Sequence, residues 1–205
     1  INMSQLTIDD IEKMEEEKLY KDTPESLLLD CRIESALTLD EVEIINKHHF
    51  FDNSIIKADQ DNNLFIDVKK ITVDNIYDLE VVVLDFDSKF KDWLSIAKVY
   101  YRCAVFLYGI EHTNVKHAIC NIGYYYFQLG ELSLARLFFR VVSDSKEFEC
   151  YSFIDLADLH VSLAECEFFD NRYRESALNY QCAFNYLADT EQSKKLNCLS
   201  QITAC

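Results

Sequence analysis

The stretch KHAICNIGYYYFQLGELSLARLFFRVV, residues 116–142, decides the fold class of this chain. Its pattern is that of two helices folded back on each other at Gly130, which supplies the left-handed backbone that ends a helix at low cost. Bulky side chains recur at helical spacing on both sides of this glycine: Ile119, Ile122, Tyr126, Phe139 and Val142. Gly123 and Ala135 allow the two helix axes to approach closely. The stretch therefore predicts a helical hairpin.

This order of small and large residues resembles the tetratricopeptide repeat, whose repeat length is about 34 residues. Weaker hairpins flank the central one, and their paired helices are predicted at residues 76–86 with 93–107, and 151–169 with 173–187. The corresponding positions Ala104, Val142 and Ala183 are 38 and 41 residues apart, which predicts lengthened helices or links. We therefore expect an all-α, tetratricopeptide-like helical-hairpin solenoid over residues 76–205, capped by a last helix at about 190–204.

Composition agrees with this class. The 205-residue chain is 49% hydrophobic, with 14 Phe and 12 Tyr, enough to build one core. Only 3 glycines and 1 proline leave little turn vocabulary for a sandwich or barrel. The net charge of -16 would repel nucleic acid and anionic membranes, so a basic protein partner is favoured. The alternative is that the acidity serves solubility alone.

The eight cysteines form no CxxC pair. Four of them fall on apolar faces of predicted helices, where buried free thiols are expected: Cys103, Cys120, Cys166 and Cys182. The sequence shows no secretory signal and no apolar run near the roughly 20 residues that span a bilayer. These features predict a reducing compartment, nucleus or cytoplasm, and no membrane partner.

Residues 1–75 form a predicted acidic N-terminal extension. Its segment 9–30 holds nine acidic residues against three lysines. Helices are predicted near 8–20, 24–35 and 39–48, the last with a capping box formed by Thr38 and Glu41. Residues 52–63, rich in Asp and Asn, are expected to be a loop, and residues 64–73 to form a short hairpin. The segment is either an acidic arm for a basic ligand or a solvated helical face.

Two parts of the chain carry a narrower resemblance. The runs YRCAVFLYG (101–109) and AICNIGYYYFQLGE (118–131) resemble the passage from the first to the second repeat of the histone-chaperone family of nuclear autoantigenic sperm protein and its fungal relatives. The runs at 134–142, 157–187 and 194–202 resemble the later part of that family, with Leu163, Ala164 and Glu165 as its LGE-type turn. The resemblance implies an ATP-independent carrier of core or linker histones rather than an enzyme.

In such a solenoid the first helix of each hairpin lines the concave face. The side chains expected to turn away from the hairpin partner are His117, Cys120, Tyr124, Phe127 and Gln128 in the central hairpin, and Asp158, Val161, Glu165, Phe168 and Phe169 in the third. We select as the partner-binding set Tyr124, Phe127, Gln128, Asp158, Glu165 and Phe168. The aromatic rings would give apolar anchorage and the carboxylates would pair with Lys or Arg. The alternative is that Phe127 and Phe168 belong to the core.

Catalysis finds little support in the sequence. The histidines form no HExxH motif, never approach a cysteine at zinc-finger spacing, and accompany no glycine-rich phosphate loop. We therefore predict no enzyme, no metal and no cofactor, and rank a site built on His112, His117 and Cys120 far behind. The alternative to the chaperone is a tetratricopeptide scaffold that holds components of an unrelated complex. A homodimer that covers an open end of the solenoid is a further prediction.

Overall fold

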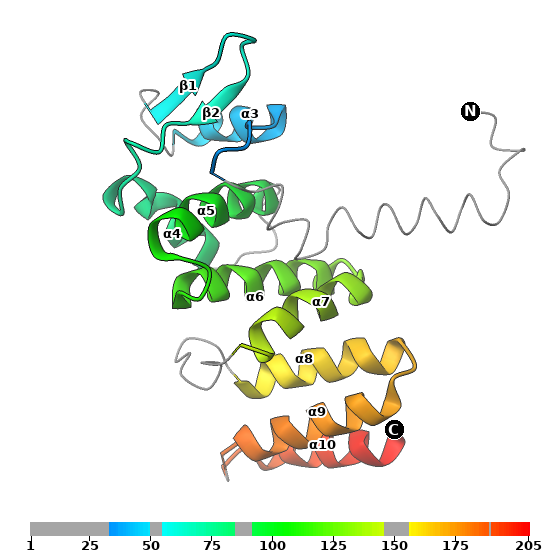
Figure 1. Ribbon diagram of the computed structural model, residues 1–205. Coiled ribbons are helices and arrows are strands. Elements are labelled where there is room, and N and C mark those ends of the chain that lie inside the picture. Colours follow the sequence, from blue (N-terminus) through cyan, green and yellow to red (C-terminus); the bar gives the residue numbers. More distant parts are fainter. Residues whose placement is uncertain (1–32, 50–54, 85–91, 146–155, 189) are drawn as a thin grey trace, which may run out of the picture.

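The computed structural model describes residues 33–49, 55–84, 92–145, 156–188 and 190–205. These parts of the chain are mainly helical, as predicted (Figure 1). The elements in chain order are α3 (Leu39–His48), β1 (Ile56–Ala58), β2 (Leu64–Ile66), the 3-10 helix η3 (Asp74–Ile76), α4 (Tyr77–Leu84), α5 (Trp93–Tyr108), α6 (Thr113–Gln128), α7 (Leu132–Ser143), α8 (Leu156–Phe169), α9 (Tyr173–Tyr186) and α10 (Gln192–Ala204).

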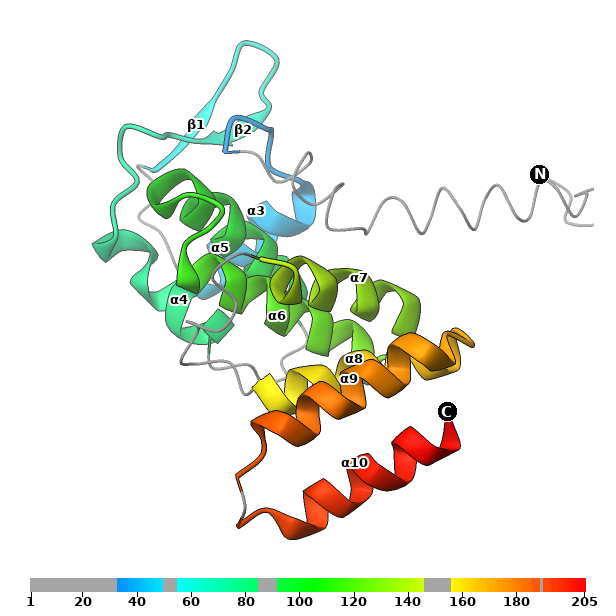
Figure 2. The same cartoon turned by 60° about the horizontal axis from the view of Figure 1, so that its bottom comes forward.

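From α4 to α10, each helix packs against the next one along the chain. Figures 1 and 2 show α3 and the two strands at one end of this stack and α10 at the other. Among the described helices, none combines the length and the apolar character that a membrane crossing requires. The stack therefore has a direction, from the N-terminal extension to the last helix.

The N-terminal extension contains the predicted hairpin, but its position in the sequence prediction was wrong. The first strand, β1, lies within the predicted loop, and it pairs antiparallel with β2 so that Ile56 faces Ile66. The Asp- and Asn-rich residues form only the turn, where Asp59 Oδ1 accepts bonds from the backbone N–H groups of Asp61 and Asn63, both at 2.9 Å. A strand of three residues is too short to show a period, so the sequence marked the turn and missed the strand.

Helix α3 was predicted correctly, including its capping box: Thr38 Oγ1 accepts from the Glu41 N–H and Glu41 Oε2 accepts from the Thr38 N–H. The helix predicted near residues 8–20 and most of that near 24–35 lie outside the described residues. The last three positions of the second, residues 33–35, form a turn and a bend.

Residues 33–75 pack on the helical stack, a question that the sequence left open. The buried Arg102 of α5 donates from Nη2 to Glu41 Oε1 at 3.1 Å and from Nη1 to the Ser35 carbonyl at 2.8 Å. Ile45 of α3 and Ile66 of β2 belong to the same apolar core as α5 and α6. The described residues on the two sides of the predicted boundary at 75/76 thus share one core.

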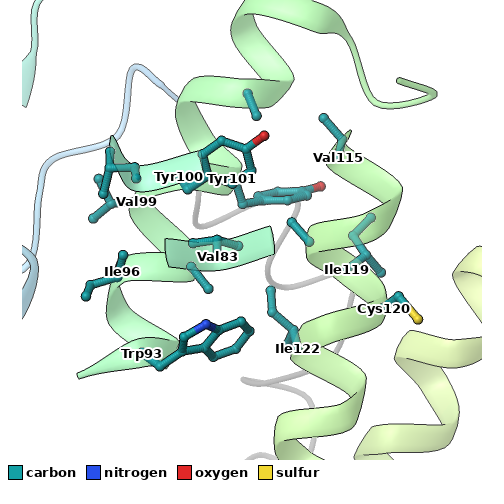
Figure 3. Packing of buried hydrophobic residues seen from close by; sticks show 14 of the residues in the cluster. Val83, Trp93, Ile96, Val99, Tyr100, Tyr101, Val115, Ile119, Cys120 and Ile122 are labelled. Carbon is teal, nitrogen blue, oxygen red and sulfur yellow. The ribbon is translucent and has the colours of Figure 1, made fainter. Parts of the chain in front are cut away.

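Helices α4, α5 and α6 enclose the centre of this core (Figure 3). Trp93, Tyr100 and Tyr101 of α5 are fully buried between Val83 of α4 and Ile122 of α6. The cysteines are free thiols, of which Cys103, Cys120 and Cys166 are buried, as predicted, and Cys182 is half-buried. Burial raises the pKa of each of the three buried thiols to about 12, so they stay protonated at neutral pH.

The central hairpin, α6 with α7, has the geometry that the sequence predicted. Gly130 follows α6 with a φ of 78°, in the left-handed region, and its N–H donates to the Phe127 carbonyl. A Cβ placed on Gly123 would lie 2.8 Å from two ring atoms of Phe139, so this glycine permits the close approach of the helices. Ala135 is fully buried in the same contact.

Candidate partner-binding surface

The three residues predicted to line a groove on α6 have different positions. The half-buried Tyr124 and Phe127 rings both contact Phe139 of α7, with centroid distances of 4.9 and 6.3 Å. They therefore pack toward the hairpin partner rather than away from it. Gln128 is exposed at the end of α6. Cys120, also expected on the groove side, is buried in the core.

On α8 the predicted residues reach the surface. Asp158 is exposed, and its Oδ1 lies 3.7 Å from Lys194 Nζ of α10. Glu165 is half-buried, and among the described residues it makes no ion pair or side-chain hydrogen bond. Partial burial raises the pKa of the Glu165 carboxyl above its ordinary value. The structure thus leaves one desolvated carboxylate on α8 without a cation.

A group of aromatic rings lies one turn beyond Glu165. Phe168 is half-buried and meets Phe169 and Tyr173 edge-on, with centroid distances of 6.1 and 5.3 Å. Phe169 is 67% exposed, and the Tyr173 hydroxyl donates to Asn171 Oδ1 at 2.7 Å. The sequence analysis missed Tyr173 because it counted only first helices, whereas the short α8–α9 link brings the start of α9 back beside the end of α8.

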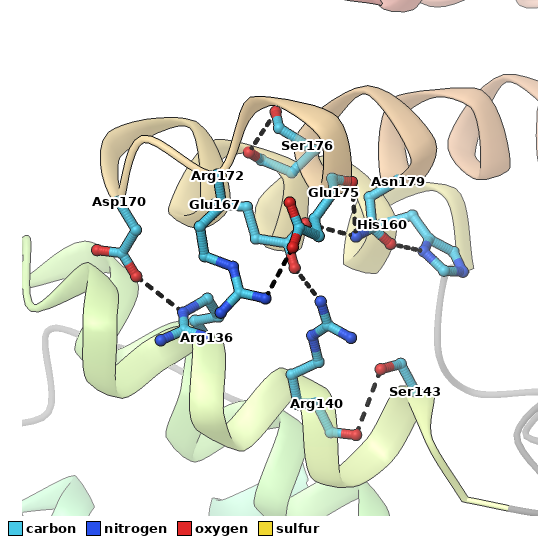
Figure 4. A network of polar contacts seen from close by, with 11 residues as sticks. Arg136, Arg140, Ser143, His160, Glu167, Asp170, Arg172, Glu175, Ser176 and Asn179 are labelled. Atoms are coloured by element: carbon cyan, nitrogen blue, oxygen red, sulfur yellow. Dashed lines mark hydrogen bonds and ion pairs between the residues drawn. The ribbon is translucent and has the colours of Figure 1, made fainter. Parts of the chain in front are cut away.

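A polar network joins α7, α8 and α9, and the sequence analysis missed it (Figure 4). Arg136 Nε donates to Asp170 Oδ2 at 2.8 Å, and Arg140 pairs with Glu167. The two arginines are four residues apart and the two carboxylates three apart, so each pair lies on one helix face. That spacing was the available signal, but it identifies the partner helix only when the packing is known.

Glu167 is the centre of this network, with 0% exposure. Its Oε2 accepts from Asn179 Nδ2 at 2.7 Å, and Asn179 Oδ1 lies 2.8 Å from His160 Nδ1. Burial lowers the pKa of His160, which favours a neutral ring that donates from Nδ1 to this amide oxygen. The ring also stacks on Tyr186 at 5.6 Å. These contacts make the network part of the fold, not a free surface.

The residues considered for catalysis do not form a nucleophilic site. His112 caps the start of α6, where its Nδ1 accepts from the Asn114 N–H at 3.2 Å, and it stacks on Tyr108. The buried Cys120 thiol, with its raised pKa, does not form a thiolate at neutral pH. Within the residues that the structure describes, no group of three or more His, Cys, Asp or Glu side chains is placed to hold a metal ion.

Most cations near the helices are already paired, whereas many carboxylates are not. Ion pairs occupy Lys47, Lys57, Arg102, Lys116, Arg136, Arg140, Arg172 and Lys194. Exposed carboxylates that form no ion pair within the described ranges are Glu34, Asp40, Glu43, Asp61, Asp74, Asp78, Glu131 and Asp144. The net negative charge of the chain is therefore presented at its surface.

No protein-family model matches this chain, and neither curated proteins nor solved structures give a match. The resemblance to tetratricopeptide repeats and to the histone chaperones stays a prediction from the residues that carry it.

Proposed function

We propose that this chain is a tetratricopeptide-type helical-repeat protein that binds a basic segment of another protein, and that it acts as a histone chaperone. The observation that carries the proposal is Glu165, a half-buried carboxylate with no cation among the described residues. Partial burial of an unpaired carboxylate costs free energy, and a Lys or Arg side chain from a partner would offset that cost.

The site centres on α8 rather than on α6. Asp158, Glu165 and Phe169 are separated by seven and four residues, so they share one helix face. The exposed Phe169 and Tyr173 offer apolar contact at one end of this face. Tyr124 and Phe127 support the site from within the central hairpin, because they already contact Phe139. Unpaired carboxylates elsewhere would steer a basic partner toward the protein.

A titration against core-histone complexes, with an equally basic unrelated peptide as control, tests this function. Calorimetry at low and at physiological salt would measure both affinities. We expect histone binding to persist at physiological salt while peptide binding is lost, because several charged pairs and aromatic burial act together. Equal, weak binding to both ligands would contradict the proposal.

A pair of variants tests the site itself. Asp158→Asn with Glu165→Gln should weaken histone binding about tenfold, equivalent to about 1.4 kcal/mol. Glu131→Gln with Asp144→Asn removes the same charge from other exposed positions and should change affinity little. Equal losses in both double variants would mean that only net charge matters.

The raised pKa of Glu165 adds a pH signature. Binding needs the ionised carboxylate, so affinity should fall as the pH falls through this raised pKa. In Glu165→Gln that part of the pH dependence should disappear. A pH profile that is identical in the variant would remove Glu165 from the site.

The exposed aromatic rings favour a second candidate, a scaffold or adaptor that holds components of an unrelated complex. Phe169 and Tyr173 could bind an apolar partner without charge. This candidate predicts binding that is insensitive to salt and indifferent to histones. The predicted homodimer is tested separately, by light scattering at several protein concentrations.

A further inference from the structure

Helix α4 carries an exposed row of large apolar side chains on its outer face. We name Val73, Tyr77 and Val81 the α4 ridge; they are 51%, 60% and 46% exposed. Val73 has helical backbone angles, φ -57° and ψ -41°, so it continues the helix through η3. Residues four apart lie on one face of a helix, so the three side chains form a continuous ridge about 12 Å long.

The opposite face of α4 fixes this ridge in place. Ile76, Leu79 and Val83 have 0% exposure and lie in the central core. The helix therefore cannot rotate to bury Tyr77 or Val81 without exposing these residues.

Both ends of the helix are also held. At the start, Thr72 and Asn75 exchange side-chain bonds with each other's backbone N–H, at 2.9 and 3.4 Å. At the end, the Val82 carbonyl accepts from Trp93 Nε1 at 3.2 Å and the Val83 carbonyl accepts from Asn121 Nδ2 at 3.0 Å. The ridge is thus a preformed surface, which lowers the cost of binding.

Two carboxylates border the ridge. Asp74 and Asp78 each follow a ridge residue in sequence, both are exposed, and neither makes an ion pair with another described residue. A partner that covers the apolar row would bring cations close to them. Apolar contact bordered by unpaired negative charge complements a segment with apolar residues on one face and Lys or Arg beside it.

We propose that the α4 ridge docks an amphipathic, basic helix of a partner protein. A ridge of residues spaced four apart fits the groove between the corresponding ridges of a second helix, the commonest way in which helices pack. The ridge spans about two turns, so the contact is small and the affinity weak, in the micromolar range or above. This surface is separate from the α8 site and does not depend on the proposed function.

The test is an NMR titration of ¹⁵N-labelled protein with an 18-residue helical peptide of Leu, Ala and Lys that has one apolar face. A peptide of the same composition with scrambled order is the reference. We expect the amide signals of residues 73–84 to shift with the amphipathic peptide and not with the scrambled one.

Matched variants locate the binding. Tyr77→Gln with Val81→Gln should weaken peptide binding at least tenfold. Phe106→Gln, which removes an apolar side chain of 46% exposure from α5, should leave binding unchanged. Asp74→Asn with Asp78→Asn should weaken it at low salt, unlike Asp61→Asn with Asp144→Asn. Circular dichroism of each variant checks the fold, and the Asp variants test the surface even where the Tyr77 and Val81 variant is unstable.

The proposal is overturned by shifts confined to α8, by no shift at α4 with millimolar peptide, or by equal losses in the Phe106 variant. Loss of binding in the Glu165→Gln variant together with unchanged α4 shifts would overturn nothing at the ridge; it supports the two surfaces as independent. Failure of histone binding would likewise affect the proposed function and leave the ridge supported by its own titration.

Discussion

The hairpins α6–α7 and α8–α9 have the same backbone geometry but different interiors. In both, the residue after the helix-ending position has a positive φ, 78° at Gly130 and 59° at Asn171. In both, the next N–H donates back to a carbonyl five residues earlier, at 3.0 Å from Glu131 and at 2.8 Å from Arg172. The two links correspond at an interval of 41 residues, which matches the interval expected between Val142 and Ala183.

At the same interval, the contents of the two hairpins differ. Tyr126 and Phe138 stack in the first, with ring centroids 5.5 Å apart. The equivalent positions in the second are Glu167 and Asn179, joined by a hydrogen bond of 2.7 Å. Helix packing thus tolerates an aromatic or a polar pair at one position, provided that every buried polar atom has a partner.

The largest expected effect comes from moving the polar residue into the aromatic hairpin. Tyr126→Glu should lower the free energy of unfolding by about 4 kcal/mol, because it buries a carboxylate without a cation. The arginine equivalent to Arg140, at an interval of 38 residues, is Arg102, and it is already paired with Glu41. Urea unfolding followed by circular dichroism measures the change.

Tyr126→Phe is the control, since it keeps the stacked ring, and it should cost about 1 kcal/mol or less. Comparable losses in the two variants would mean that the position is sensitive to any change, not to charge.

The reverse exchange tests the polar hairpin. Glu167→Ala should cost about 3 kcal/mol, because it leaves Arg140 and Asn179 without their shared acceptor. Replacing the whole group by apolar residues, Arg140→Met with Glu167→Leu and Asn179→Leu, should recover most of this loss. If the triple variant is less stable than Glu167→Ala, the polar group stabilises the hairpin in its own right.

The small residues at the helix contacts provide a third comparison. Gly123→Ala should destabilise by about 1 to 2 kcal/mol, since its Cβ would press on the Phe139 ring and outweigh the gain in helix propensity. The equivalent Ala164 already accommodates a Cβ, and Ala164→Gly should cost about 1 kcal/mol from propensity alone. Thermal unfolding of the two variants checks the order; a stabilised Gly123→Ala would show that the ring moves aside freely.

The links should show the smallest effects. Asn171→Gly should stabilise by a few tenths of a kcal/mol, up to about 0.5, because glycine adopts a positive φ without strain. Gly130→Asn should cost a similar amount, and Gly130→Ala about 1 kcal/mol. Equal stabilities for Gly130→Asn and Gly130→Ala would mean that the asparagine side chain gives no local help in this link.

Local signals predicted the helices well and the strands poorly. The regular recurrence of apolar residues over 116–142 located α6 and α7, and Thr38 with Glu41 located the start of α3. The three-residue strand β1 has no comparable period, so it was assigned to a loop. For the candidate site, helical spacing placed Asp158 and Glu165 on one exposed side of α8. The same spacing misplaced Tyr124 and Phe127, since one helix turn separates a groove side chain from one that packs on Phe139.

The sequence by itself determined what depends on neighbouring residues: helix period, the left-handed stop at Gly130, the small contact residue Gly123 and the acidic excess. Only the tertiary structure decided which charges meet, because Arg140 and Glu167 or Arg102 and Glu41 lie far apart along the chain and pair through packing. It also decided which acidic residues stay unpaired. Glu165, Asp74 and Asp78 are ordinary carboxylates in the sequence, and burial of one and exposure beside an apolar ridge of the others distinguish them in the fold.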